Sequence, residues 1–235
     1  MTLAITPVRG VGVITAGADL VDALLVALAG TGDELADGDI IAVTSKVVAK
    51  SEDRVVACAP TEEAKVALVE GEARRVLRRR GPLRITETTH GFVCANAGVD
   101  LSNTDEGTAV LLPVDPDRSA RRFRADVRRR TGRDVAVVVT DTFGRPWRQG
   151  VTDVAIGVAG LRPVLDLRGT RDAFGHLLEA TEVAIVDEIA AAADLVLGKA
   201  SATPFAIIRG APAEWFGEGS VAADVVRRPD EDLFR

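Results

Sequence analysis

The chain has 235 residues, of which 47% are hydrophobic, 27% charged and 4% aromatic, a composition that excludes disordered, collagen-like and mini-protein classes. Its 29 basic and 35 acidic residues give a formal net charge of −6, so it lacks the overall cationic field that would hold a nucleic acid. Cys58 and Cys94 form no CxxC pair, and no apolar run approaches the ~18 residues of a membrane span. We therefore expect a cytoplasmic protein without membrane or nucleic-acid partners, folded as one domain over residues 1–235 with two sub-lobes.

Apolar spacing and capping residues predict the elements of the first half of the chain. Leucines at helical spacing predict a helix over Leu20–Leu28, and the β-branched run Ile40–Val43 predicts a buried strand. A second helix is expected over Thr61–Arg80, capped by Thr61 and ending in a run of five solvated arginines. The stretch 85–103 is rich in Gly, Thr and Asn, which is typical of strands joined by loops.

The second half of the chain repeats this alternation without a regular βαβ period. The expected strands are Val110–Val114, a run from Asp134 to Thr140 that ends at Asp141, and Pro204–Ile208. The expected helices are Pro116–Arg130 and Thr181–Leu197, the latter capped by Thr181. The sequence therefore predicts a mixed α+β fold that is neither a P-loop nor a Rossmann fold.

The standard nucleotide-binding motifs do not fit this sequence. The segment 197–201 (LGKAS) resembles the end of a P-loop, but Ala193 stands where the first glycine is needed. Gly10-Val11-Gly12 lacks the third glycine of a dinucleotide fingerprint. A polyanionic ligand would therefore have to be held by local side chains or through metal ions.

Three polar segments are candidates for such a site, and the first is Thr44–Lys50 (TSKVVAK), which follows a predicted buried strand. Its hydroxyls and ammonium groups leave the core where phosphate oxygens could be met, and Lys46 and Lys50 could share a face. The alternative is an ordinary strand end with solvated lysines.

The second candidate segment, 89–103, packs polar and small residues into one loop-like stretch. Asp100 and Asn103 supply the carboxylate and amide oxygens that hard cations prefer. A lone histidine such as His90 is more often structural than a ligand, and Cys94 is expected to pack as a small apolar group.

The third segment, 139–150 (VTDTFGRPWRQG), carries the strongest local signal. An aspartate at the end of a buried strand projects into the crevice where open sheets bind ligands, so Asp141 is expected to hold a metal ion. Thr142 could add a hydroxyl or carbonyl oxygen, and Arg145 and Arg148 could neutralise phosphate or carboxylate groups. The alternative is a capped turn with surface arginines. Two later acids, Asp187 and Glu188, are weaker candidates because adjacent helical acids diverge and usually face water.

Taken together, these segments indicate divalent-metal chemistry on a phosphorylated substrate, without fixing the reaction. At the same residues the sequence resembles the coenzyme F420-0:L-glutamate ligase family, whose members add γ-linked glutamates to a deazaflavin cofactor. The matching blocks follow one another in order along the chain: 38–48, 90–103, 139–150, 187–194, and 203–204 through 209–210. The resemblance implies a two-lobed subunit and a homodimer with the site near the interface. Some members of the family continue into a nitroreductase-like flavin domain, which we do not expect in this sequence.

The resemblance also implies roles for particular residues. It implies two divalent metal ions, Mg2+ or Mn2+, together with K+. The metal ligands that it implies are Asp100, Asp141 and Thr142. GTP would be bound by Val11, Gly12, Val13, Ile14, Ser45, Lys50 and Asn103, while Asp141, Lys50 and Arg145 would act in catalysis. Some relatives carry a glutamine metal ligand in the loop equivalent to 198–201, where this chain has none, so water or Ser201 would replace it.

The implied reaction uses GTP to phosphorylate the terminal carboxylate of F420-0, after which the amine of L-glutamate displaces phosphate, once or repeatedly. Two other functions use the same residues: a metal-dependent phosphohydrolase or phosphotransferase, and a non-catalytic deazaflavin-binding protein. A ligase should form GDP rapidly only when both the acceptor and L-glutamate are present.

Overall fold

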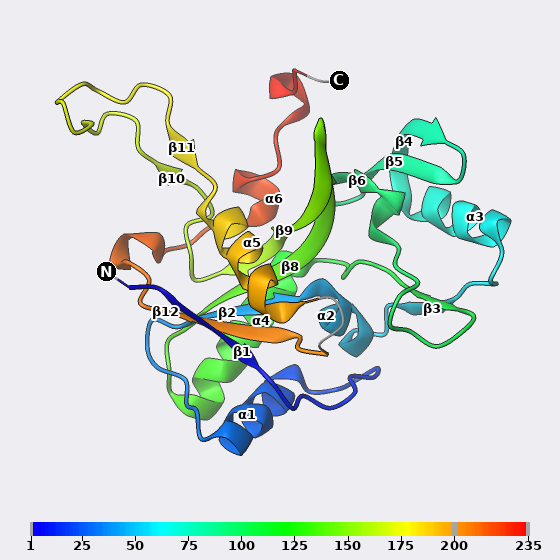
Figure 1. Ribbon diagram of the computed structural model, residues 1–235, viewed down its shortest axis with the longest axis horizontal. Coiled ribbons are helices and arrows are strands. Elements are labelled where there is room, and N and C mark those ends of the chain that lie inside the picture. The colour runs from blue at the N-terminus through cyan, green and yellow to red at the C-terminus, as the bar shows by residue number, and fades with distance from the viewer. Residues whose placement is uncertain (1, 199–201, 234–235) are drawn as a thin grey trace.

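The computed structural model describes residues 2–198 and 202–233, and its centre is a five-stranded mixed sheet (Figure 1). Only β2 and β8 run parallel; the other neighbouring strands are antiparallel. In spatial order the strands are β1 (Ala4–Val8), β12 (Phe205–Arg209), β2 (Ile40–Thr44), β8 (Ala136–Arg145) and β9 (Arg148–Ala159).

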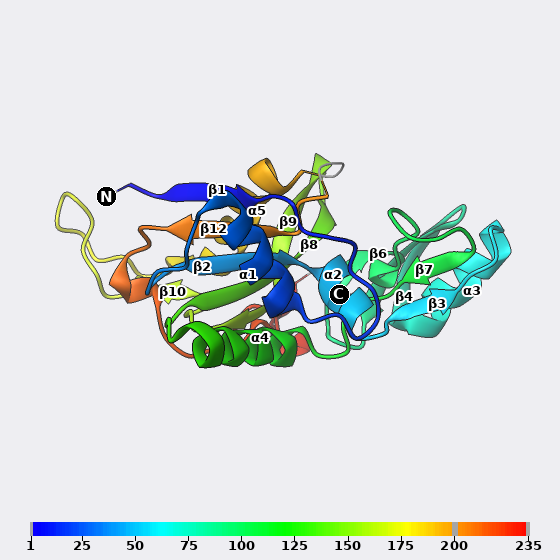
Figure 2. The same ribbon diagram turned by 90° about the horizontal axis from the view of Figure 1, so that it is seen from below.

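Helices α4 (Pro116–Thr131) and α5 (Ile185–Leu197) cover opposite faces of this sheet (Figure 2). The strands between them are apolar on both faces, and Ile40–Val43 and Ala136–Val139 are almost completely buried. Helix α4 begins at Asp115, whose carboxylate accepts from the Arg118 N–H, with Pro116 in the first turn. These features place the main hydrophobic core on both sides of β2 and β8.

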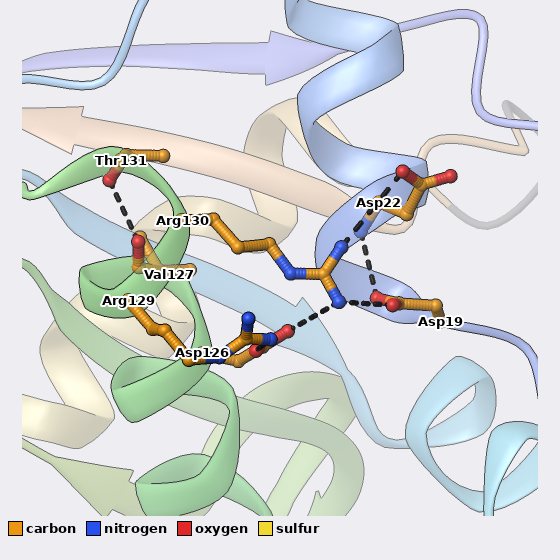
Figure 3. Close-up of polar contacts among 7 residues, drawn as sticks. All are labelled: Asp19, Asp22, Asp126, Val127, Arg129, Arg130 and Thr131. Atoms are coloured by element: carbon orange, nitrogen blue, oxygen red, sulfur yellow. Dashed lines mark hydrogen bonds and ion pairs between the residues drawn. The ribbon is translucent and has the colours of Figure 1, made fainter.

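Ion pairs of Arg130, in α4, connect this helix to the start of helix α1 (Leu20–Thr31) (Figure 3). The Arg130 guanidinium pairs with Asp19, the N-cap of α1, and lies 2.8 Å from an Asp126 carboxylate oxygen on its own helix. Asp22 is at 3.9 Å from the same guanidinium. The backbone N–H of Asp22 and the Arg130 side chain both stabilise the charged Asp19 carboxylate, so they lower its pKa.

A second, smaller core lies beside the sheet, on the right of Figure 1. It consists of Cys58, Val69, Ala97, Val99, Ala109 and Leu111. Around it lie α3 (Glu62–Glu72), the pair β3 (Val55–Ala57) and β7 (Thr108–Val110), and the sheet of β4 (Ala73–Arg80), β5 (Leu83–Thr88) and β6 (Val93–Ala95).

The remaining elements are short. They are α2 (Ser45–Ser51), the pair β10 (Leu165–Asp166) and β11 (Glu182–Val183), α6 (Val221–Asp224), and 3-10 turns at Asn96–Gly98, Ala213–Trp215 and Pro229–Glu231. Within the described ranges, no helix combines the length and apolar character needed to cross a membrane.

The mixed α+β class is confirmed, as are most elements expected from the sequence. Helices α1 and α4 and strand β2 form where they were predicted, and strands joined by loops occupy 85–103. Thr61 caps α3, because its hydroxyl accepts from the Ala64 N–H at 3.1 Å.

The expected helix over Thr61–Arg80 is wrong in its second half, because α3 ends at Glu72 and the arginine run forms strand β4. That strand pairs with β5 through a short connection at Gly81-Pro82, and its arginines meet acids of neighbouring elements. Arg75 lies 2.8 Å from the buried carboxylate of Glu87. Pairing with a neighbouring strand therefore overrides the helical preference of the arginines.

Three predicted boundaries also need correction. Helix α5 begins at Ile185 after Ala184, so Thr181 is not its cap, since 182–183 pair with β10. Strand β7 ends at Val110, so the expected strand through Val114 is wrong for its last four residues. Strand β8 does not stop at Asp141 but continues to Arg145 in a hairpin with β9.

Candidate active site

The parallel pairing of β2 and β8 brings Ser45 and Asp141 together. Thr44 lies opposite Thr140 in the sheet, so the residues that follow them emerge at the same edge. The Ser45 hydroxyl, at the start of α2, donates to an Asp141 carboxylate oxygen at 2.7 Å. Ser45 is buried, so this bond fixes the carboxylate from one side.

The Asp141 carboxyl group is in an environment that disfavours its charge. Burial raises its pKa to about 6, and the negative charges of Asp153 and Asp100 push in the same direction. Hydrogen bonds from Ser45 and from the Thr142 backbone oppose this effect without cancelling it. A carboxylate held this way gains from a nearby cation, as a metal ligand would.

Asp100 reaches the site from the side of the smaller core. Its backbone pairs with Val110 at 2.8 and 2.9 Å, which fixes its position beside β7. Burial disfavours its charge, but hydrogen bonds from Lys46 and Ser102 outweigh burial and hold its pKa below the usual range. The Lys46 ammonium lies 2.7 Å from the carboxylate.

Helix α2 directs both of its lysines at the loop that follows Asp100. Lys46 donates to the Ser102 carbonyl and hydroxyl at 2.9 Å, and Lys50 donates to the Asn103 carbonyl at 2.8 Å. The prediction that these lysines share a face is therefore confirmed. The Asn103 backbone has a φ of 53°, so the loop turns sharply at the residue expected to contact the nucleotide.

Thr142 lies next to Asp141 in β8, but its side chain is directed to another acid. Its hydroxyl donates to Asp153 at 2.5 Å, while the Thr140 hydroxyl donates to the second Asp153 oxygen at 3.0 Å. Because successive side chains alternate across a strand, this cluster lies on the face opposite Asp141. The Thr142 hydroxyl therefore points away from Asp141, and Thr142 would reach a cation beside Asp141 through its backbone carbonyl.

Asp153 is a site residue that the sequence reasoning missed. It is only 4% exposed and lies directly opposite Thr142 in the hairpin. Strand β9 was not predicted, so nothing placed Asp153 beside β8. The signal that could have revealed it is the segment 151–159, where one acid interrupts an otherwise apolar and small run.

The other predicted site residues lie further out. Arg145 is exposed at the end of β8, where it donates to the Gln149 carbonyl at 3.2 Å, four residues beyond Asp141. Ile14 is buried in the main core, Val13 is 90% exposed, and the segment after this turn is tied to α2 by a bond from Gly17 N–H to the Ser51 carbonyl at 2.9 Å. Of the loop 198–201, only Gly198 is among the described residues, so the predicted role of Ser201 lies outside them.

Other polar residues singled out by the sequence have structural environments. The His90 ring stacks on Phe92 and its Nε2 meets the Pro113 carbonyl at 2.9 Å, as expected of a structural histidine. Cys94 is buried, and burial and the Asp141 charge raise its pKa to about 12, so the thiol stays neutral. Asp187 does not face water as predicted, because its carboxylate accepts from the Ala155 N–H at 2.9 Å.

The donor set is rich in oxygen but sparse in acids. In the described part of the chain, no three His, Cys, Asp or Glu side chains converge on a common cation position. The predicted ligands are two carboxylates and a threonine, so a divalent ion bound here would complete its shell with substrate or water oxygens, as Mg2+ commonly does. The metal assignment of Asp100, Asp141 and Thr142 stays a prediction.

The described residues bring two carboxylates, a serine and two lysines together where the parallel pairing of β2 with β8 ends, a combination suited to an enzyme that acts on phosphorylated substrates. The model of the family described as F420-0:Gamma-glutamyl ligase matches residues 10–210. The chain belongs to this family, as its sequence predicted.

Curated relatives match along most or all of their length. The coenzyme F420:L-glutamate ligase of Methanothermobacter thermautotrophicus is 40% identical over 251 aligned residues, covering 100% of both chains. That of Methanopyrus kandleri is 40% identical over 252 residues, covering 100% of this chain and 98% of its own. That of Methanocaldococcus jannaschii is 40% identical over 215 residues, covering 85% of each.

Proposed function

We propose that the protein joins L-glutamate to coenzyme F420-0 in γ-linkage at the expense of GTP and with divalent metal ions. Coenzyme F420:L-glutamate ligation is the activity of the family to which the chain belongs. The observation that carries the proposal is the meeting of Ser45 and Asp141 at the ends of parallel strands, opposite Asp100 and the lysines of α2.

The residues present fit a hard divalent cation. Asp141 and Asp100 interact electrostatically across the site, and the pKa of Asp141 is raised first by burial and then by the negative charges of Asp153 and Asp100. Asp141, Asp100 and Thr142 would hold Mg2+ or Mn2+, two ions in all, and K+ would assist; water or Ser201 would replace the glutamine of some relatives. When bound, such ions neutralise charge that develops on transferring phosphoryl groups.

We further propose that GTP lies along α2. Lys50 and Ser45 would contact its phosphates from the helix, and Asn103 and the turn of Val11, Gly12, Val13 and Ile14 would enclose the nucleotide. The Lys50 ammonium already approaches within 2.8 Å of the Asn103 carbonyl, so the lysine and the nucleotide loop lie within reach of one ligand. Arg145 would stabilise the transferring group from the hairpin.

The reaction would proceed in two steps, a phosphoryl transfer followed by an acyl transfer. A carboxylate oxygen of F420-0 attacks the γ-phosphorus of GTP, the bond to the bridging β-phosphate oxygen breaks, and GDP leaves. The glutamate amine then attacks the acyl carbon of this acyl phosphate, the bond to the phosphate oxygen breaks, and the amine proton passes to solvent or to a site carboxylate. Lys50 and Arg145 would hold the phosphoryl oxygens in line in the first step.

We also propose that the active form is a homodimer with the site near the interface, and that the two hydrophobic cores are sub-lobes of a single ligase domain. Size-exclusion chromatography with light scattering would measure the oligomeric state. A monomer at assay concentration with full activity would contradict the dimer.

Mass spectrometry of products from F420-0, L-glutamate, GTP and Mn2+ tests the function. We expect glutamyl products and GDP with all four components, GDP formation to collapse when either the acceptor or L-glutamate is omitted, and ATP to replace GTP poorly. Rapid GDP release without L-glutamate would indicate a phosphohydrolase. Deazaflavin binding with no turnover would indicate a binding protein.

A further inference from the structure

The hairpin of β8 and β9 extends beyond the sheet that carries it (Figure 1). Strand β2 pairs with β8 only from Ala136 to Thr140, whereas β8 and β9 stay paired up to Arg145 and Arg148. Residues after Thr140 therefore form a two-stranded ribbon, with Asp141 at its base. At about 3.3 Å per residue, the tip lies roughly 13 Å from Asp141.

The tip of this ribbon has three features that oppose stability. Trp147 is 85% exposed and has a φ of 57°, a left-handed conformation that is costly for a bulky residue. Arg145 and Arg148 lie directly opposite each other in the hairpin, where like charges repel. Among the described residues, neither arginine forms an ion pair. Other arginines of the chain do pair with carboxylates, namely Arg75, Arg84, Arg130 and Arg209.

Strain and like charges without a carboxylate partner, found together at an exposed tip, point to a ligand that relieves them. The ligand must offer an aromatic face to the indole and negative charge to the two guanidinium groups. An indole flanked by arginines is a stacking platform for a planar heterocycle that bears anionic groups.

We propose that Trp147 and Arg148 at the tip bind the acceptor of the ligation, with its deazaflavin ring against Trp147, while Arg145 keeps the role toward the transferring phosphoryl group that is proposed above. This inference rests on the proposed function, because it places the acceptor's terminal carboxylate at the base of the ribbon near Asp141. Phe143, which packs on Phe92 with ring centroids 6.1 Å apart, supports the ribbon between the two ends.

A second copy of the chain is the competing occupant of the tip. The exposed apolar side chains there are Trp147, its turn neighbour Pro146 and Val151, whereas a stable interface buries about 800 Å² on each partner. A compact aromatic and cationic site therefore fits a small anionic ligand better than it fits a partner surface.

The test measures F420-0 affinity directly, from the anisotropy of its own fluorescence, in the absence of GTP and L-glutamate. We expect Trp147→Ala to raise the Kd about tenfold, and Trp147→Phe to raise it by about threefold or less, because a smaller ring still stacks. Arg148→Gln should weaken binding and reduce its dependence on salt. The matched control is Phe174→Ala, since Phe174 is 88% exposed on another loop and should leave the Kd unchanged.

The chain offers an internal optical signal, because it contains two tryptophans and no tyrosine. Acceptor binding should quench the emission of the wild type and of Phe174→Ala, and quench much less in Trp147→Phe, where only Trp215 remains. Circular dichroism and light scattering on each variant report fold and oligomeric state.

Three outcomes decide the inference. It is overturned if Trp147→Ala binds F420-0 within twofold of the wild type while the wild type ligates glutamate, a result that leaves the proposed function intact. It is also overturned if Trp147→Ala changes the oligomeric state without changing the Kd, which would assign the tip to a second copy. Absence of glutamyl product from a wild type that binds F420-0 through Trp147 would refute the proposed function alone.

Discussion

Asp141 illustrates how a single side chain can be costly for the fold and suited to its chemistry. It lies where the pairing of β2 with β8 ends, and burial, together with the negative charges of Asp153 and Asp100, raises its pKa to about 6. A carboxylate whose folded pKa lies above its unfolded value favours the protonated form of the folded protein. It therefore contributes instability as pH rises from about 4 through 6, and this contribution is complete at neutral pH.

We predict that Asp141→Asn stabilises the metal-free protein at pH 7 by about 1–3 kcal/mol, because the amide keeps a bond to Ser45 without a buried charge. The same change should lower Mn2+ affinity and reduce kcat about a hundredfold or more. Thermal unfolding in EDTA at pH 4 and pH 7, with and without Mn2+, measures the first effect. The stability difference should shrink toward pH 4, and a variant less stable than the wild type in EDTA would show that Asp141 is a structural turn residue.

Asp153 is a second buried carboxylate near the site, and it accepts hydrogen bonds from the hydroxyls of Thr140 and Thr142. We predict that Asp153→Asn weakens Mn2+ binding about tenfold, because it removes a negative charge that acts on Asp141 and weakens the hydrogen bond that fixes Thr142 directly after it. Calorimetric titration with Mn2+ alone provides the measurement. A double-mutant cycle combines Asp153→Asn with Thr142→Val. If Asp153 acts through Thr142, the double variant should lose less Mn2+ affinity than the sum of the two single variants. Fully additive losses would show that the two residues act independently.

Elements were predictable where local chemistry and tertiary environment agree. The cap Thr61 and the buried runs of β2 and β8 reflect local rules, and the nearness of Ser45 and Asp141 follows once those strands are parallel. Strand β4 was not predictable from its arginines, because its conformation depends on β5 and on Glu87. Asp153 was not predicted for the same reason, because only the pairing of β8 with β9 brings it next to Thr142.

The bend in β9 depends on a close approach that only glycine allows. A Cβ on Gly157 would lie 2.4 Å from the Pro116 carbonyl carbon and oxygen, both backbone atoms that cannot move aside. The same approach lets the buried Asp117 carboxylate accept from the Val158 N–H at 2.9 Å. The register shift between Val139 and Thr140 lies opposite, immediately before Asp141.

We predict that Gly157→Ala lowers the free energy of unfolding by about 2–3 kcal/mol, because overpacking pushes β9 off the start of α4. Urea denaturation measures the loss. The control is Gly30→Ala in α1, where nothing lies within 4 Å of the added methyl and a helical alanine should stabilise by about 1 kcal/mol. Equal stabilities for the two variants would show that β9 can relax around the methyl group.

At the scale of the whole molecule, the candidate site lies between the two hydrophobic cores. Asp141 and Ser45 belong to the main sheet, whereas Asp100 is fixed by β7 beside the smaller core. Without a ligand, the ion pair between Lys46 and Asp100 bridges this boundary, and such a partly exposed pair contributes little stability, about 1 kcal/mol or less. A cation held by both aspartates would be a stronger link between the cores.

We therefore predict that Mn2+ with GTP protects the amides of 100–104 and 141–145 together in hydrogen exchange. Binding at a hundred times the Kd should stabilise the folded protein by about 2.7 kcal/mol, and both cores should share this gain if one site joins them. Asp100→Asn should abolish protection of 100–104 while leaving part of that at 141–145, since Asp141 and Ser45 stay in place. The loop of 167–181, which contains none of the proposed ligands, serves as the internal control. Protection confined to 141–145 in the wild type would remove Asp100 from the metal site and leave its carboxylate as a partner of Lys46.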